Sequence, residues 1–194
     1  MPKSKEAGDT VQTLADQVLA ELSRVLRAID EASVQRFVEA ILTANRLVTY
    51  GAGRMGILSS TFAMRLMHLG FQSHVLREPT TPAIGQGDLL ILSSGSGETQ
   101  TVYDVAVLAK KNGVQIALLT VRPVSRLRQL ADVVVEFSAL QKPVDGEVEF
   151  QSIQPMTTLT EQSLLLFLDI VVLKLMTATR QTTEDLWRRH CNLE

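Results

Sequence analysis

The chain has 194 residues, of which 45% are hydrophobic and 21% charged, and its formal net charge is −2. This composition is typical of an ordinary globular domain with a full core, and the balanced charge excludes a broad basic surface for nucleic acid or acidic lipid. One cysteine and three scattered histidines exclude an internal disulfide framework and a zinc cluster, and they fit a reducing cytoplasm.

The amino-terminal part of the chain is predicted to be helical after a short polar start. Residues 1–9 are expected to be disordered, and a single domain is expected over 10–194. Thr10 is a candidate N-cap for a first helix, because apolar residues then recur at intervals of three and four. The narrow apolar stripe suits helix contacts within the subunit or across a dimer. A second helix is predicted over 33–44.

From residue 46 onward, short apolar strands alternate with helical segments. Continuously apolar strands are typical of a parallel sheet that is buried on both faces by helices. The sequence therefore predicts an α/β fold, a three-layer αβα sandwich with a five-stranded parallel sheet in the flavodoxin-like order 2-1-3-4-5. The predicted strands are 46–50, 73–76, 89–92, 115–120 and 132–137, and the predicted helices between them are 57–69, 99–112 and 126–130.

The carboxyl-terminal part is predicted to contain a long polar loop over 138–157 and then a helix over 158–179. That helix is apolar nearly all round, so we expect it to be buried. Its longest apolar run, 164–176, contains two charged residues and is expected to be too short to cross a membrane. Thr182 or Thr183 is expected to cap a last short helix.

The stretch that follows the third predicted strand has the composition of a phosphate-binding loop. Ser93–Gly97 is rich in serine and glycine, and Glu98 and Thr99 then open a helix. Glycines permit a close approach of the backbone, while hydroxyls and the free N–H groups of a helix start donate to an anion. The loop has no lysine, so a sugar phosphate suits it better than ATP. The alternative is a strand-to-helix turn that binds no ligand.

A second glycine-rich segment, Gly51–Gly56, follows the first predicted strand. Its G-x-G-x-x-G spacing also occurs in dinucleotide-binding sites, which need an acidic residue about twenty positions further on. Glu78 lies near that position but stands between Arg77 and Pro79, so the spacing is only a weak indication of a dinucleotide site. In the predicted strand order, the first and third strands are neighbours and their helices lie on opposite faces. Ligands bind at such a switch point, so we expect the two glycine-rich segments to form one crevice.

Six segments carry a resemblance to a known family: Gly51–Gly56, Phe62–Phe71, Thr80–Ala83, Ser94–Thr99, Gln154–Gln162 and Arg189–Glu194. Together they resemble the sugar isomerase (SIS) domain family, and within it the hexuloisomerase branch. The resemblance implies interconversion of D-arabino-hex-3-ulose 6-phosphate and D-fructose 6-phosphate, the second step of formaldehyde fixation by the ribulose monophosphate route. It further implies a sugar-phosphate substrate, no cofactor or metal, and a homotetramer with sites near subunit boundaries. The resemblance covers about residues 46–194.

The resemblance also implies roles for particular residues. It places the general base, which would act through an enediol, on Glu161. Of the loop hydroxyls, those of Ser94, Ser96 and Thr99 are the best candidate donors to phosphate. A further contact falls on Met55, where the family usually has serine, and a thioether cannot donate that hydrogen bond. The substrate-contacting loop falls on Gly95, Ser96, Gly97, Glu98, Thr99 and Gln100.

Several of these residues have alternative interpretations. Glu161 stands in the first turn of the last long helix, where a carboxylate also stabilises a helix end. Glu98 is the rival base, although a role at a helix terminus or on a sugar hydroxyl fits its position better. His190 is a candidate acid–base group from a tail that can reach a neighbouring subunit, or else an exposed histidine. Arg54 either helps neutralise phosphate or is a solvated loop arginine.

Two other functions remain open from the sequence. One is a sugar-phosphate isomerase of different specificity, because position 55 departs from the family pattern. The other is a non-catalytic domain that binds a sugar phosphate, although no DNA-binding segment of a regulator is recognisable.

Overall fold

The computed structural model describes residues 10–137 and 152–193, so the expected disordered start (1–9) and most of the predicted polar loop (138–151) lie outside the described residues. A five-stranded parallel sheet has the order β2-β1-β3-β4-β5, which confirms the predicted topology. Its strands are β1 (Leu47–Gly51), β2 (Ser73–Val75), β3 (Leu89–Ser93), β4 (Gln115–Thr120) and β5 (Val133–Glu136).

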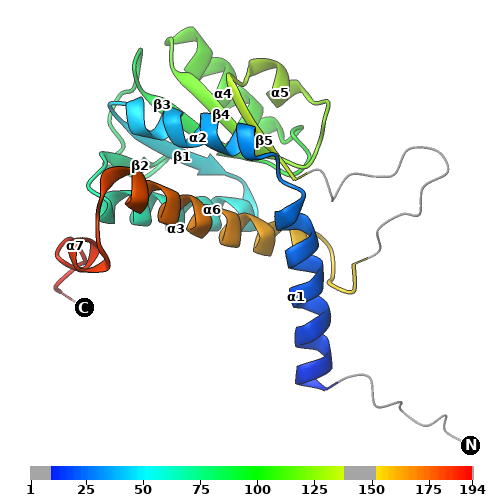
Figure 1. Ribbon diagram of the computed structural model, residues 1–194. Helices are drawn as coiled ribbons and strands as arrows, with labels where there is room; N and C mark the ends of the chain where they lie inside the picture. The colour runs from blue at the N-terminus through cyan, green and yellow to red at the C-terminus, as the bar shows by residue number, and fades with distance from the viewer. Residues whose placement is uncertain (1–9, 138–151, 194) are drawn as a thin grey trace, which may run out of the picture.

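Helices cover both faces of this sheet and make the predicted three layers. Helices α3 and α6 lie along one face, and α4 and α5 lie along the other (Figure 1). The helix α2 packs on the same face as α3 and α6. The helices are α1 (Val11–Arg27), α2 (Glu31–Thr43), α3 (Gly53–His68), α4 (Gln100–Lys111), α5 (Arg126–Leu130), α6 (Thr158–Thr179) and α7 (Thr183–Trp187).

The central strands are mostly apolar because successive side chains enter two different cores. Val48 and Leu90 pack against α4 and α5, whereas Leu47 and Ile91 pack against α3 and α6. All four side chains are almost completely buried. This double burial is the physical reason why the strands were recognisable from unbroken apolar runs.

Two helices begin earlier than predicted. The helix α2 begins at Glu31 and is capped by Asp30, whose carboxylate accepts a hydrogen bond from the Ser33 N–H at 2.8 Å. The helix α3 begins at Gly53 instead of residue 57, so most of the second glycine-rich segment is helical. A Cβ atom at Gly56 would lie 2.5 Å from the carbonyl oxygen of Gly51. These glycines therefore allow the start of α3 to pack closely on the end of β1.

The helix α6 is buried on one side only, which corrects the expectation that it is buried all round. Leu164 and Val171 are fully buried against the sheet, whereas Leu166, Ile170 and Leu173 are exposed, the last of them by 62%. The 22 residues of α6 are long and apolar enough to cross a membrane by length and composition alone, whereas the prediction considered only the shorter apolar run 164–176. Its inner face is instead part of the core of the domain.

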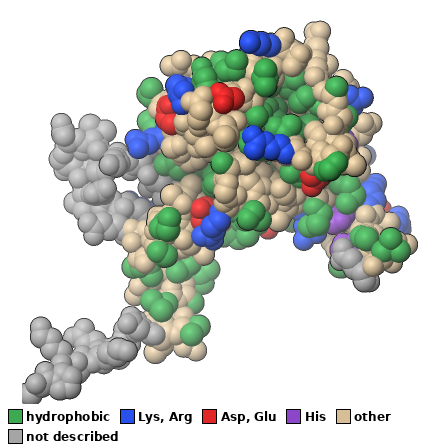
Figure 2. All heavy atoms as spheres, turned by 180° about the vertical axis from the view of Figure 1, so that it is seen from behind, with side chains coloured by type: hydrophobic (Ala, Val, Ile, Leu, Met, Phe, Trp, Pro, Cys, Tyr) green, Lys and Arg blue, Asp and Glu red, His purple; other side chains and the backbone are tan. Residues whose placement is uncertain are grey.

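The helix α1 projects from the rest of the structure as an arm (Figure 1). Only its carboxyl-terminal part is packed, through Leu22 and Val25. Hydrophobic side chains continue along the projecting part, as Figure 2 shows, and they include the exposed Val11, Leu14 and Leu19. The arm thus carries apolar surface that the described part of this chain does not cover.

Glu21 of α1 holds the segment that leads into α6. Its carboxylate accepts hydrogen bonds from Ser152 Oγ at 2.7 Å, from the Ile153 N–H at 2.8 Å and from Gln154 Nε2 at 2.8 Å. Burial raises the pKa of Glu21, but these three hydrogen bonds outweigh it, so the pKa lies below its ordinary value of 4.5. The charged form of Glu21 therefore stabilises the folded state.

Replacement of Glu21 by glutamine is expected to lower the Tm by about 3 °C at neutral pH, because hydrogen bonds to a charged acceptor are lost. The unfolded chain binds the proton of Glu21 more readily than the folded chain. The stabilisation is thus fully present above about pH 4.5 and is lost as the pH falls through the lower pKa of the folded protein. Thermal unfolding of both proteins between pH 3 and 7 tests this, and a Tm difference that does not shrink in acid would contradict it.

Candidate functional site

The two glycine-rich segments meet at the carboxyl edge of the sheet. Strands β1 and β3 are parallel neighbours, and Gly51 is paired with Ser93 at their ends. Ser59 of α3 joins them further, because its Oγ donates to Ser93 Oγ at 2.9 Å. Since α3 and α4 leave these strands on opposite faces, the predicted switch point is present.

The loop after β3 is held in one conformation by bonds to its own residues and to β4. The Gly97 N–H lies 3.2 Å from both Ser94 Oγ and the Ser94 carbonyl oxygen. The Gly95 carbonyl oxygen accepts from Thr120 Oγ1 at 3.3 Å and from the Val121 N–H at 3.2 Å. These contacts give the loop its shape without using the donors that face outward.

Several donors of this loop have no partner within residues 10–137 and 152–193. They include the N–H group of Ser96 in the loop and those of Thr99, Gln100 and Thr101 at the start of α4. The hydroxyls of Ser96 and Thr99 stand beside them on partly or fully exposed residues. Free N–H groups at a helix N-terminus attract anions, because the helix dipole adds to their hydrogen bonds. The loop can therefore hold a phosphate.

The carboxylate of Glu161 lies at the start of α6, with only 9% of the side chain exposed. Its Oε1 accepts a hydrogen bond from Thr157 Oγ1 at 2.9 Å. Its Oε2 lies 2.6 Å from Arg54 Nη1, an ion pair whose N–H bonds are not aligned for a hydrogen bond. Neither oxygen accepts from an N–H group of α6 in the described chain, so the side chain does not cap the helix through a hydrogen bond, and only its position in the first turn of α6 matches the helix-end interpretation.

The loop after β3 and the start of α6 lie against each other. A Cβ atom at Gly95 would lie 3.7 Å from Cγ2 of Thr160, the residue that precedes Glu161. Arg54 of α3 completes the group, because it contacts Glu161 and lies 3.4 Å from Thr158 Oγ1. Three segments that are far apart in the sequence therefore bring anion donors, a guanidinium and a buried carboxylate to one edge of the sheet.

Two predicted loop residues point instead toward α5. Glu98 accepts from the Arg126 N–H at 2.9 Å and from Arg126 Nε at 2.7 Å, and Gln100 Oε1 accepts from Arg126 Nη1 at 3.2 Å. The hydrogen bond from the Arg126 side chain, together with that from its N–H, holds the pKa of Glu98 below its usual value. Glu98 is thus a charged partner at the start of α5, which favours the helix-terminus interpretation over a role as base.

Met55 does not offer the hydroxyl group that the resemblance leads us to expect at this position. Its side chain is partly buried and packs against the apolar cluster between the sheet, α3 and α6. The position supplies hydrophobic contact and no hydroxyl donor.

His190 is not brought to Glu161 within one chain. Its ring lies 5.3 Å from that of His68 and 4.9 Å from that of Trp187 between ring centres. His68 ends α3, whereas Arg54 begins it. Their separation of 14 positions along the helix corresponds to about 21 Å at about 1.5 Å per residue. His190 therefore lies at the opposite end of α3 from the carboxylate.

The sequence interpretation missed the residues that position the site. Thr157 stands four residues before Glu161, and this spacing on one helix face was a usable signal. Arg126 is 28 residues away from Glu98, and no local pattern predicts that pair. Within the described ranges, no group of three histidine, cysteine or acidic residues could hold a metal ion.

Comparisons with known proteins show which family and which relatives the chain resembles. The model of the SIS domain matches residues 40–167. A 3-hexulose-6-phosphate isomerase of Bacillus subtilis is 38% identical over 178 residues, which are 92% of this chain and 96% of that protein. One of Mycobacterium gastri is 39% identical over 201 aligned residues and covers 100% of both chains. A crystal structure from Methanococcus jannaschii, from which the molecular function of 3-hexulose-6-phosphate isomerase was inferred, has a TM-score of 0.80 and 33% identity over 93% of this chain and 99% of that one.

Proposed function

The chain belongs to the SIS domain family, and on that premise we propose that it interconverts D-arabino-hex-3-ulose 6-phosphate and D-fructose 6-phosphate. The reaction would take place in the cytoplasm, as the second step of formaldehyde fixation by the ribulose monophosphate route. One observation carries the proposal, namely the buried carboxylate of Glu161 beside a loop with unpartnered anion donors. The names of the most similar relatives support the choice of sugar.

The residues on this edge of the sheet suit each step of such a reaction. The N–H groups and hydroxyls after β3 hold the phosphate, which leaves the sugar free to extend toward α6. Glu161 takes the proton from C2 and gives an enediol, then returns a proton to C3. The hydroxyl proton on O2 moves to O3, so the carbonyl group passes from C3 to C2 with no net gain or loss. Arg54 and Thr157 orient the carboxylate.

His190 is not part of this proposed mechanism, because it lies at the far end of α3 in its own chain. It could reach a substrate bound beside Glu161 only from a neighbouring subunit.

We further propose that the chain forms a homotetramer through its uncovered apolar surfaces. The outer face of α6 and the projecting α1 carry large exposed hydrophobic side chains that a second copy would cover. Leu173→Glu places a charge in the centre of the α6 face and is expected to yield smaller particles by sedimentation. Val124→Glu changes a valine on a loop that is more exposed than Leu173, and this variant is expected to sediment as a particle with the mass of four chains. Equal sedimentation of both variants would contradict this interface.

The direct test of the proposed function is turnover of D-arabino-hex-3-ulose 6-phosphate in a coupled assay that consumes fructose 6-phosphate. We expect turnover by the purified chain without added metal or cofactor. Faster conversion of another ketose phosphate would identify an isomerase of different specificity. Binding without any turnover would identify a domain that only binds sugar phosphates.

Replacement of Ser96 by alanine is expected to raise KM by about tenfold to a hundredfold, because one hydrogen bond to a charged phosphate is worth about 1.5–3 kcal/mol. The effect on kcat should be smaller, since the hydroxyl binds phosphate equally in the ground and transition states. Steady-state kinetics of both proteins measure the two constants. An unchanged KM would show that Ser96 does not contact the phosphate.

A further inference from the structure

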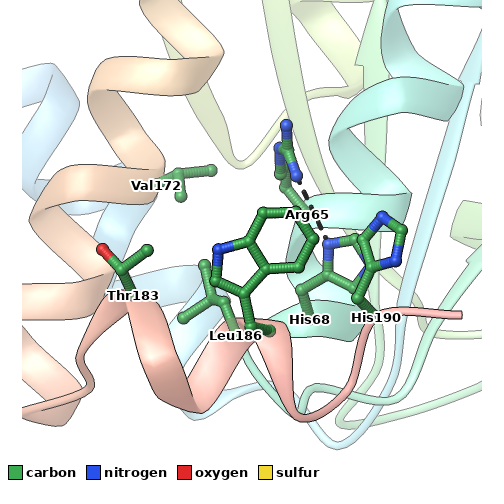
Figure 3. Close-up of a pocket in the computed structure, with 7 residues that line it drawn as sticks. Arg65, His68, Val172, Thr183, Leu186 and His190 are labelled. Carbon is green, nitrogen blue, oxygen red and sulfur yellow. Dashed lines mark hydrogen bonds between the residues drawn. The ribbon is translucent and has the colours of Figure 1, made fainter. Parts of the chain in front are cut away.

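A cavity of about 340 Å³ lies at the end of α3 that is remote from Glu161. Figure 3 shows Arg65 and His68 of α3, Val172 of α6, and Leu186 of α7 around it. Its volume falls in the range of small-molecule sites, about 300–1,000 Å³. The length of α3 separates it from the Arg54–Glu161 pair by about 20 Å. The cavity is therefore a different site from the one at the carboxyl edge of the sheet.

One wall of this cavity is basic. Arg65 makes one side-chain hydrogen bond in the described structure, to His68 Nδ1 at 3.5 Å, and no described carboxylate lies within 4.0 Å of its guanidinium. The carboxylate of Asp185 accepts hydrogen bonds from Thr182 and from Arg188. The N–H groups of Arg65 that remain can thus donate to a ligand, and no lining residue is acidic.

His190 adds a second polar group to that wall. Its Nδ1 lies 2.9 Å from the Cys191 carbonyl oxygen, which can only accept, so Nδ1 is the donor. Nε2 is left for another partner: in the neutral ring it accepts from the hydroxyl of a monoanionic phosphate, and in the imidazolium it donates to a phosphate oxygen. Its ring contacts those of His68 and Trp187, at 5.3 Å and 4.9 Å between ring centres. Figure 2 shows histidine beside lysine or arginine side chains in the region of this carboxyl-terminal tail.

The opposite wall is apolar and aromatic. Val172 and Leu186 supply aliphatic surface, and Trp187 leaves 65% of its large side chain exposed at the cavity. An exposed indole offers a flat face on which a planar ring can stack. The cavity therefore combines donors for an anion with a surface for a ring.

We propose that this cavity binds a ring-bearing organic phosphate, the chemistry of a nucleoside monophosphate. Arg65 and His190 hold the phosphate, and Trp187 and Leu186 hold the ring. Inorganic phosphate would use only the basic wall, on which Arg65 is solvent-exposed, so it should bind much more weakly. The proposal does not rest on the isomerase activity, because it involves neither Glu161 nor the loop after β3.

The experiment uses the fluorescence of Trp187, which is the single tryptophan of the chain and therefore reports on this cavity. The full-length protein is titrated with phenyl phosphate, AMP, inorganic phosphate and phenol. We expect a saturable change in Trp187 emission with phenyl phosphate or AMP, at concentrations at least tenfold lower than with inorganic phosphate or phenol. Arg65→Met should weaken that binding tenfold or more.

Two control variants separate this cavity from other anion sites. Arg188→Met removes the same charge from a neighbouring exposed position that does not line the cavity, and it should bind phenyl phosphate normally. Ser96→Ala alters the loop after β3 and should also leave the Trp187 response unchanged. The proposal is overturned if neither ring-bearing phosphate changes the emission, or if inorganic phosphate binds equally well. It is also overturned if Ser96→Ala abolishes the response and Arg65→Met does not. A change in emission that depends on protein concentration and not on ligand would overturn it as well, because a second copy of the chain would then fill the cavity.

Discussion

Replacement of Glu161 by glutamine is expected to lower kcat by about a thousandfold, within the hundredfold to ten-thousandfold range of general base catalysis. Glutamine keeps the size of the side chain and can still accept the hydrogen bond from Thr157 Oγ1, but it cannot take a proton from carbon. The coupled assay measures kcat and KM, and KM should change little. The Tm should fall by a few degrees only, because the lost partner, Arg54, is 59% exposed.

Glu39→Gln is the matched control for this substitution. Glu39 is an exposed carboxylate of α2 that bonds only to Gln35 among the described side chains, so its loss should not change kcat. If the Glu161→Gln protein has a near-normal kcat, Glu161 is not the base, whatever the effect of the substitution on KM. The carboxylate would then orient Arg54 at the site without reacting itself.

Replacement of Gly97 by alanine is expected to destabilise the protein by about 3 kcal/mol and to raise KM more than tenfold. Gly97 has a φ of +65°, which costs a residue with a Cβ about 1–2 kcal/mol. The new Cβ would also lie 2.2 Å from Ser125 Oγ, so the loop or α5 must move, at a typical cost of about 1–3 kcal/mol. Denaturant unfolding measures the first effect, and steady-state kinetics measure the second.

Gly53→Ala separates the two causes. Gly53 has a similar φ of +58°, but a Cβ there would meet no atom within 4 Å, so only the conformational cost remains. Ser125→Gly in the Gly97→Ala background should recover most of the remaining loss, since glycine is an acceptable N-cap for α5. If the double variant is as unstable as Gly97→Ala alone, contact with Ser125 is not the cause.

Much of the candidate site could be predicted because its parts follow from local rules. The serine- and glycine-rich composition after β3 indicated anion donors at a helix start, and the strand order placed Gly51 beside Ser93. The partners of these residues could not be predicted in the same way. Arg54 and Glu161 are more than one hundred residues apart, and nothing in either neighbourhood indicates that they form an ion pair.

The sequence by itself determined the αβα sandwich, because unbroken apolar strands and alternating helices depend on burial on two faces, which is visible in the local pattern. The limits of α6, residues 158–179, are also those predicted from the sequence. Only the tertiary structure decided which face of α6 is covered, since an all-apolar helix has no periodicity to indicate it. Only the tertiary structure showed that His190 lies far from Glu161. The contact between the His190 and His68 rings places His190 at the end of α3, and the length of α3 sets its distance from the Arg54–Glu161 pair.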